Sequence, residues 1–196
     1  MSLDISRRGH RPPPDLTVTA GMDLRLSRVH EFCGPARRSL AVMVMARFQG
    51  PVIWIRPGWG GDRLHAEGVQ PLADPGRCIF VDPIRPEDLL WCAEEALRAG
   101  AVPLVVAELP QPPALTPIRR LHLAAETGAE RGGLHPLGLL LTPADGGAAG
   151  VESRWHIAGA HRPGHRPAWR LERRRARTAP VKSWEITVET LTKGPT

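Results

Sequence analysis

Short apolar runs and helical segments alternate along most of the chain. The runs lack the strict polar alternation of half-buried strands, which is typical of strands covered on both faces. They are Val29–Cys33, Val52–Ile55, Cys78–Val81, Val102–Ala107 and Leu137–Leu141. Helical composition or periodicity covers Ala36–Phe48, Asp62–Glu67, Pro86–Ala99 and Thr116–Glu130. This order predicts an α/β fold, with a mainly parallel central sheet flanked by helices on both faces.

The pattern changes after Glu152. Residues Arg154–Ile157, Ala168–Arg175 and Ser183–Glu189 alternate between apolar and polar positions, which predicts C-terminal antiparallel strands added to the sheet. At the other end, residues 1–21 contain three consecutive prolines and no sustained period. We therefore expect a flexible N-terminal arm at 1–21, one domain at 22–190 and a tail at 191–196.

Positive charge is concentrated in residues 154–182, where nine arginines and lysines face one acid, a formal charge of +8 in a chain of +6. Such a segment is a candidate contact for a polyanion. Its candidate nucleic-acid-binding residues are Arg170, Arg173, Arg174, Arg175, Arg177 and Lys182. Trp155 and Trp169 lie among the arginines, either to stack on the bases of single-stranded DNA or to face a core.

Cysteine usage and hydropathy favour a reduced cytoplasm without membrane contact. Cys33, Cys78 and Cys92 are odd in number and lack CxxC spacing, and the apolar runs are far shorter than the roughly 20 residues of a membrane span. His161 and His165 are four residues apart, but Pro163 and Gly164 between them exclude a helix. We therefore expect no metal pair there.

An incomplete phosphate-binding loop follows the first apolar run. A strand that delivers Gly34 directly to a helix is the context of such a loop, which needs successive glycines, a Lys and a Ser or Thr. Here the loop reads Gly34-Pro35-Ala36-Arg37-Arg38-Ser39 and lacks the second glycine. It is either a simple turn or the remnant of a nucleotide site that uses Arg38 and Ser39.

From Val29 to Glu189 the order of segments resembles the ATPase core of the RecA family. The stretches that carry this resemblance are VHEFCGP, VIWI, DRLHAEGV, EEALRAGAVPLVVAEL and AWRLERRRARTAPVKSWEI. The resemblance implies a RecA-like core, but no single motif of the family is intact.

The family's catalytic positions, carried over one at a time, hold the wrong residues. Gly58 stands at the position of the glutamate that orients water, and Pro143 stands at that of the glutamine that senses the γ-phosphate. The Walker B acid falls on Glu108, and the two lysines that reach a neighbouring nucleotide fall on Arg174 and Ala176. The resemblance therefore implies no ATP hydrolysis and no cofactor, with a vestigial nucleotide site at Gly34, Arg38, Ser39 and Glu108.

Within this superfamily the chain is most similar to the ImuA-type proteins. The shared stretches are GPARR, IRRLHLAAE, RWHI and WRLERRRARTAPVKSWEI. This resemblance implies a non-catalytic accessory of the DNA-damage (SOS) response that supports error-prone translesion synthesis. Its expected partners are error-prone polymerase components or a RecA filament, with single-stranded DNA as a further candidate. A cell-division inhibitor resembling SulA and a DNA-stimulated ATPase with an atypical loop remain alternatives.

Overall fold

The computed structural model describes residues 13–177, 179–188 and 190. Its strands are β1 (Asp15–Thr19), β2 (Met22–Arg25), β3 (Val29–Cys33), β4 (Val52–Ile55), β5 (Cys78–Val81), β6 (Leu104–Glu108), β7 (Leu137–Leu141), β8 (Ser153–Gly159), β9 (Ala168–Ala176) and β10 (Lys182–Thr187). Its helices are α1 (Arg37–Met45), α2 (Ala66–Val69), α3 (Pro86–Ala99) and α4 (Leu115–Gly132), with a 3-10 turn, η1, at Pro75–Arg77. Among these described residues, no helix is long and apolar enough to cross a membrane.

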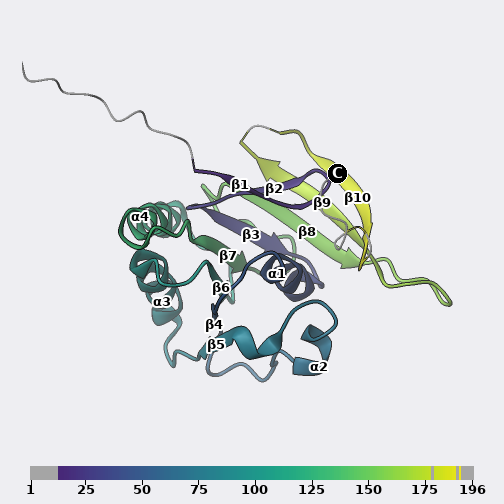
Figure 1. The fold of residues 1–196 in the computed structure, drawn as a ribbon, viewed down its shortest axis with the longest axis horizontal. Helices are drawn as coiled ribbons and strands as arrows, with labels where there is room; N and C mark the ends of the chain where they lie inside the picture. Colours follow the sequence, from purple (N-terminus) through teal and green to yellow (C-terminus); the bar gives the residue numbers. More distant parts are fainter. Residues whose placement is uncertain (1–12, 178, 189, 191–196) are drawn as a thin grey trace, which may run out of the picture.

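Eight of the strands form one sheet in the order β10-β9-β8-β3-β7-β6-β4-β5 (Figure 1). The six strands from β8 to β5 are mutually parallel, whereas β9 and β10 are antiparallel to their neighbours. The predicted mainly parallel sheet with antiparallel C-terminal strands is therefore confirmed. The three apolar runs in β3, β6 and β7 are buried throughout, as expected for strands at the centre of such a sheet.

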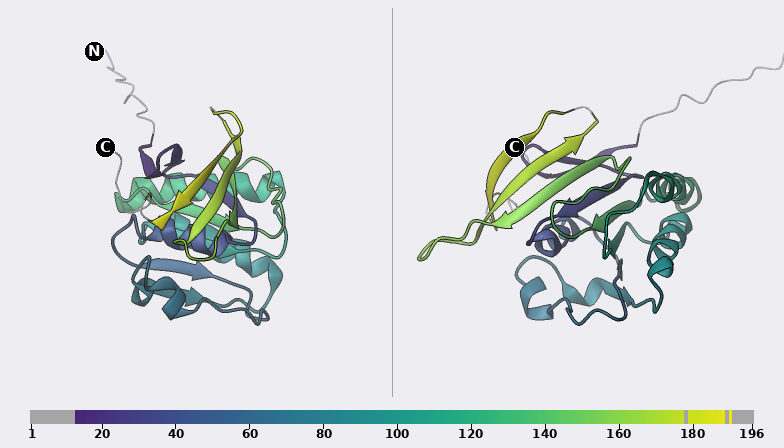
Figure 2. Two further views of the ribbon diagram at one scale, coloured as in Figure 1. Left: turned by 90° about the vertical axis from the view of Figure 1, so that its right-hand side faces the viewer. Right: turned by 180° about the vertical axis from the view of Figure 1, so that it is seen from behind.

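Two hydrophobic cores lie on opposite faces of this sheet. Leu104 and Val106 of β6 belong to the core that contains α1, while Val105 and Ala107 belong to the core under α3 and α4. This division follows from the strand period of two, which sends successive side chains to opposite faces. The further views of Figure 2 show the helices on the two sides of the sheet.

A flexible arm was predicted at residues 1–21, and this prediction was wrong for residues 13–21, which the structure describes. Strands β1 and β2 form an antiparallel hairpin, and Gly21 between them adopts a positive φ of 82°. Val18 and Met22 are fully buried in the core that contains α1. The proline run ends at Pro14, so it does not reach the strand that follows. Residues 1–12, like the predicted tail at 191–196, lie outside the described residues.

Strand β5 was expected to be buried but is the edge strand of the sheet. Ile79 and Phe80 are 51% and 41% exposed, because β4 covers only one side of the strand. The short helix predicted at Asp62–Glu67 is also displaced and forms as α2, Ala66–Val69. An apolar run thus predicted a strand correctly without predicting its position in the sheet.

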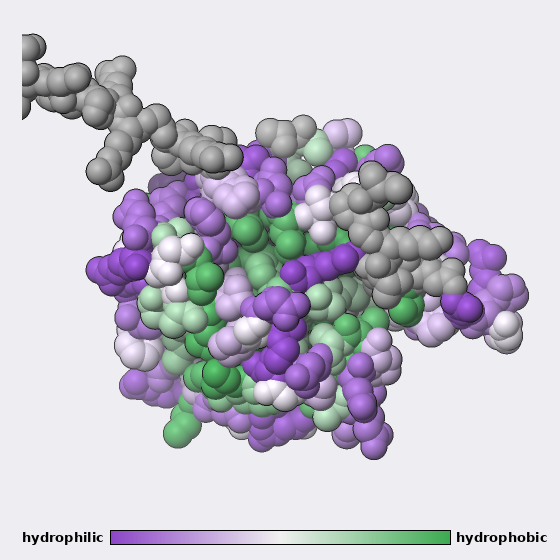
Figure 3. Space-filling model, in the orientation of Figure 1, coloured by the Kyte–Doolittle hydropathy of each residue, from purple (hydrophilic) through white to green (hydrophobic). Residues whose placement is uncertain are grey.

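The connection between β8 and β9, residues 160–167, projects from the body of the molecule (Figure 1). His161 to Pro167 are all exposed. The space-filling view shows this projection as mainly hydrophilic (Figure 3).

Candidate functional site

A cleft of about 350 Å³ lies where the parallel strands β4, β6 and β7 end. The carboxyl ends of neighbouring parallel strands meet at one edge of a sheet, which is where α/β proteins usually bind ligands. The lining residues are Arg37, Arg38, Arg56, Pro57, Gly60, Gly61, Asp62, Glu108, Leu109, Pro110, Leu141 and Pro143. The fold therefore brings Arg38 and Glu108 to the same cleft, as a nucleotide site would require.

Within the cleft, Glu108 is fully engaged by other side chains. The Arg38 guanidinium donates from Nε at 3.1 and 3.0 Å and from Nη2 at 2.6 Å to the two Glu108 carboxylate oxygens. The Trp54 indole donates a further hydrogen bond to Oε1 at 2.8 Å. Glu108 is only 7% exposed, and a carboxylate buried to this extent needs a compensating positive charge. Arg38 supplies that charge, which a metal ion would supply in an ATPase site.

The Gly34 loop directs its backbone N–H groups into the protein. Gly34 donates to the Ala144 carbonyl at 2.9 Å, and Ala36 donates to the Ile157 carbonyl at 3.2 Å. Gly34 has a positive φ of 87°, and a Cβ there would lie 2.4 Å from the Ile157 oxygen. Glycine at position 34 is thus required by the packing of the loop against β8, and these N–H groups do not form an open cradle for phosphate.

Ser39 and Gly58 do not supply the magnesium ligand and the general base of an ATPase site. Ser39 lies in the first turn of α1 and is not among the described residues that line the cleft. Gly58 donates its N–H to the Pro83 carbonyl at 3.0 Å, and a Cβ would approach that oxygen to 2.8 Å. The backbone there has no room for the glutamate that the RecA resemblance would require.

Of the two positions that resemble interface lysines, Arg174 has partners within its own chain. Its Nη1 donates to Asp145 at 2.7 Å, and its Nε donates to Glu172 at 3.2 Å. These bonds raise the pKa of Arg174 and hold the pKa of Asp145 below its ordinary value. Arg174 is therefore a cross-link between β9 and the loop after β7.

Acids from other parts of the fold compensate much of the basic segment. The pairs are Arg154 with Glu31, Arg162 with Glu185 at 3.7 Å, Arg174 with Asp145 at 2.7 Å and Arg177 with Glu152 at 3.3 Å. Since these four acids lie outside residues 154–182, they halve the +8 that the segment carries in sequence. The sequence alone could not locate them, because local patterns do not specify which distant segments meet.

The remaining candidate nucleic-acid residues divide into two groups. Arg170 contacts Glu172 at 3.0 Å, and Arg173 donates to the Pro180 carbonyl at 2.9 Å and to the Gly21 carbonyl at 3.2 Å. Arg175 and Lys182 are exposed, although the Lys182 ammonium lies 5.2 Å from the Trp184 ring centre. Arg170 is exposed as well, with 66% of its side chain in solvent, so of these four residues only Arg173 is half-buried.

The structure contradicts base stacking on Trp155 and Trp169. These side chains are 1% and 8% exposed and belong to the core that contains α1. Trp184, which is half-buried, instead packs beside Trp155 with ring centres 5.9 Å apart. The alternation of the strands turned these aromatics inward, as the core interpretation predicted.

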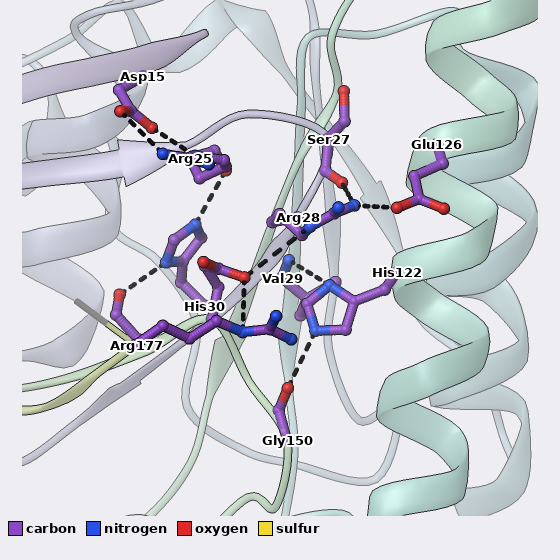
Figure 4. A network of polar contacts seen from close by, with 12 residues as sticks. Asp15, Arg25, Ser27, Arg28, Val29, His30, His122, Glu126, Gly150 and Arg177 are labelled. Atoms are coloured by element: carbon purple, nitrogen blue, oxygen red, sulfur yellow. Dashed lines mark hydrogen bonds and ion pairs between the residues drawn. The ribbon is translucent and has the colours of Figure 1, made fainter. Parts of the chain in front are cut away.

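A second polar cluster is built around the buried His30 (Figure 4). Its Nε2 lies 3.0 Å from the Arg25 carbonyl, and its Nδ1 lies 2.6 Å from the Ser153 hydroxyl. Trp155 donates to the same hydroxyl at 2.7 Å. These bonds suit a neutral ring that donates from Nε2 and accepts at Nδ1. Burial lowers the pKa of His30 to about 4.

Arg177 belongs to the same region rather than to a free basic surface (Figure 4). It shares Glu152 with Arg28, which also pairs with Glu126 of α4. This network links the end of β9, the start of β3 and α4. It explains why Arg177, a candidate DNA contact in the sequence, lies among acids in the fold.

Comparison with known proteins gives a partial structural likeness. The sequence matches no family model and no curated protein. Among solved structures the chain is similar to SulA from Pseudomonas aeruginosa, with 18% identity and a TM-score of 0.47, over 59% of this chain and 98% of that one.

Proposed function

We propose that this chain is a RecA-like accessory protein of the DNA-damage response that acts without hydrolysing ATP. It supports error-prone translesion synthesis through contacts with polymerase components or a RecA filament. The observation that carries this proposal is the engagement of Glu108 by Arg38 and Trp54. The acid that would hold magnesium in an ATPase is instead part of the protein's own ion pair.

Two loops beside the cleft support the same proposal. Gly58 offers no general base, and the N–H groups of Gly34 and Ala36 are used within the fold. General-base and electrostatic contributions of this kind are each worth roughly a hundredfold or more in rate. Several such losses together favour a scaffold that works through its surface.

A nucleotide assay tests the loss of catalysis. Isothermal titration with ATP and magnesium should show no micromolar binding, and phosphate release with single-stranded DNA should stay at the level of buffer. Arg38→Ala should remain inactive, because freeing Glu108 does not supply the missing base. Turnover by the wild-type protein that Glu108→Gln abolishes would overturn the proposal.

Complementation tests the cellular role. In a strain of the natural host that lacks this gene, the wild-type gene should restore damage-induced mutation, and Glu108→Gln should restore it equally. The equal result is expected because an adaptor needs no carboxylate for chemistry. A mutation frequency that is the same with and without the gene would contradict the role in translesion synthesis.

A division inhibitor resembling SulA is the second candidate. A strongly basic segment would favour the DNA-related role over this one, but four acids from elsewhere in the fold halve the +8 of residues 154–182. Overexpression separates the candidates. Filamentous cells without any change in damage-induced mutation would favour the inhibitor, whereas normal division with restored mutagenesis favours the adaptor.

A further inference from the structure

The loop between β8 and β9 carries a tandem repeat in an exposed position. Its sequence reads His161-Arg162-Pro163, then Gly164, then His165-Arg166-Pro167, and every one of these residues is exposed. The loop projects beyond the edge of the sheet in two views (Figures 1 and 2). It is therefore accessible to a binding partner.

The tip of this loop is a tight, hydrogen-bonded turn. The His165 N–H donates to the Arg162 carbonyl at 3.1 Å, and Gly164 has a positive φ of 74°. Proline followed by glycine at the two central positions is the signature of a type II turn. The turn places Arg162 and His165 at its two ends, on neighbouring positions of the tip.

The base of the loop is anchored to the sheet. The His161 Nδ1 accepts a hydrogen bond from the Ala168 N–H at 3.2 Å. The His161 ring also meets Trp169 edge-on, with centres 5.4 Å apart. Since Nδ1 is the acceptor, the Nε2 of a neutral ring carries the proton and is a donor. Together with two prolines, these contacts lower the entropy lost when the loop binds a partner.

The loop and the adjoining residues of β8 and β9, 153–171, contain no acidic residue. Glu185 of β10 approaches Arg162 to 3.7 Å, but the Arg162 and Glu185 side chains are 69% and 55% exposed. Arg166 also has a contact within the fold and is likewise exposed. Exposed pairs of this kind contribute little to stability, so a phosphate group can displace Glu185, which compensates Arg162 in the free protein.

We propose that residues 161–167 bind the phosphate backbone of nucleic acid. The Arg162 and Arg166 guanidinium groups would each hold a phosphate in a fork of hydrogen bonds. The Nε2–H of His161 adds a neutral donor, whereas His165 already donates its Nδ1–H to the Pro163 carbonyl at 3.0 Å. Contacts of this type fix position without reading sequence. The loop holds no large apolar side chain that could enter a bilayer, so its chemistry fits nucleic acid better than a membrane surface. This contact does not depend on the role proposed for the cleft.

Fluorescence anisotropy with labelled single-stranded and duplex oligonucleotides tests the proposal. Arg162→Ala/Arg166→Ala should weaken binding at low salt by about tenfold or more and should lower the slope of log affinity against log salt by about two. The matched control is Arg119→Ala/Arg131→Ala, which removes the same charge from exposed positions of α4. It should change both quantities much less.

A conservative variant separates charge from folding. Arg162→Lys/Arg166→Lys should keep most of the affinity, and circular dichroism should show an unchanged fold in all variants. Equal losses from the loop and α4 variants would overturn the proposal, since net charge alone would then explain binding. Tighter loop-dependent binding to phosphatidylserine vesicles than to either oligonucleotide would overturn it in favour of a membrane contact.

Discussion

Arg38 forms an ion pair with the nearly buried carboxylate of Glu108. Removing one partner of such a pair leaves an uncompensated charge. We expect Arg38→Ala to lower the free energy of unfolding by about 2 kcal/mol, discounted because Arg38 is partly exposed. Urea denaturation followed by tryptophan fluorescence measures this change.

The double variant Arg38→Ala/Glu108→Gln is the control. Glutamine is neutral and keeps an oxygen for the Trp54 N–H, so the double variant should be more stable than Arg38→Ala alone. Equal instability of the two proteins would mean that packing of the arginine stem, and not its charge, stabilises the cleft.

His30 makes the stability of the protein depend on pH. Its pKa of about 4 in the folded protein lies below the ordinary value of 6.5, so the unfolded chain binds the proton first as the pH falls. Its stabilising effect is complete above pH 6.5 and is lost progressively toward pH 4. Unfolding free energy should fall by on the order of 2 kcal/mol between about pH 7 and about pH 5 from this group.

The variant His30→Gln isolates that contribution. The difference in unfolding free energy between about pH 7 and about pH 5 should shrink in this variant, even if the protein is less stable at both values. His122, whose pKa burial also lowers, supplies a second, separate contribution that His122→Gln removes. A pH profile unchanged by His30→Gln would exclude this role of His30.

At this scale the sequence located part of the site. The RecA resemblance grouped Gly34, Arg38, Ser39 and Glu108, and the fold places Arg38 and Glu108 of this set in one cleft. The bond between Arg38 and Glu108 joins residues 70 positions apart, and that from Trp54 spans 54 positions. Local sequence patterns do not specify such pairings. The hydrogen bonds from Arg38 and Trp54 to Glu108 could therefore not be predicted from the sequence.

Among the elements, α3 and α4 meet closely at glycines. A Cβ on Gly128 would lie 2.0 Å from the Leu97 carbonyl oxygen, a backbone atom that cannot move aside easily. We therefore expect Gly128→Ala to cost about 2–3 kcal/mol through overpacking. The matched control is Gly68→Ala in α2, where a Cβ meets nothing within 4 Å; thermal melts of both proteins provide the comparison.

Elements with strong periodicity were predicted best. Pro86–Ala99 forms α3 with the predicted limits, and Gly100 ends it in a left-handed conformation with φ of 62°. The helix near Asp62 was displaced because its few apolar residues define no clear face. Strand β5 was identified, but its edge position depends on which strands pair.

In the whole molecule, the N-terminal hairpin is part of the core that contains α1. Val18, which lies within the predicted arm, is fully buried. Val18→Ala should lower the unfolding free energy by about 2 kcal/mol, whereas Ala20→Ser at the exposed turn should leave it nearly unchanged. Chemical denaturation of the full chain measures both, and equal stability of the two variants would mean that the hairpin does not contribute to the core.

The sequence by itself determined the class of the fold and the residue types at the positions that resemble an ATPase site, because apolar periodicity and residue identity are local properties. Only the tertiary structure decided which arginines remain available, since their acidic partners come from distant segments. It also decided that β1 joins the core and that Arg38 compensates Glu108. Each of these depends on pairings across the folded chain, which the linear order of residues does not specify.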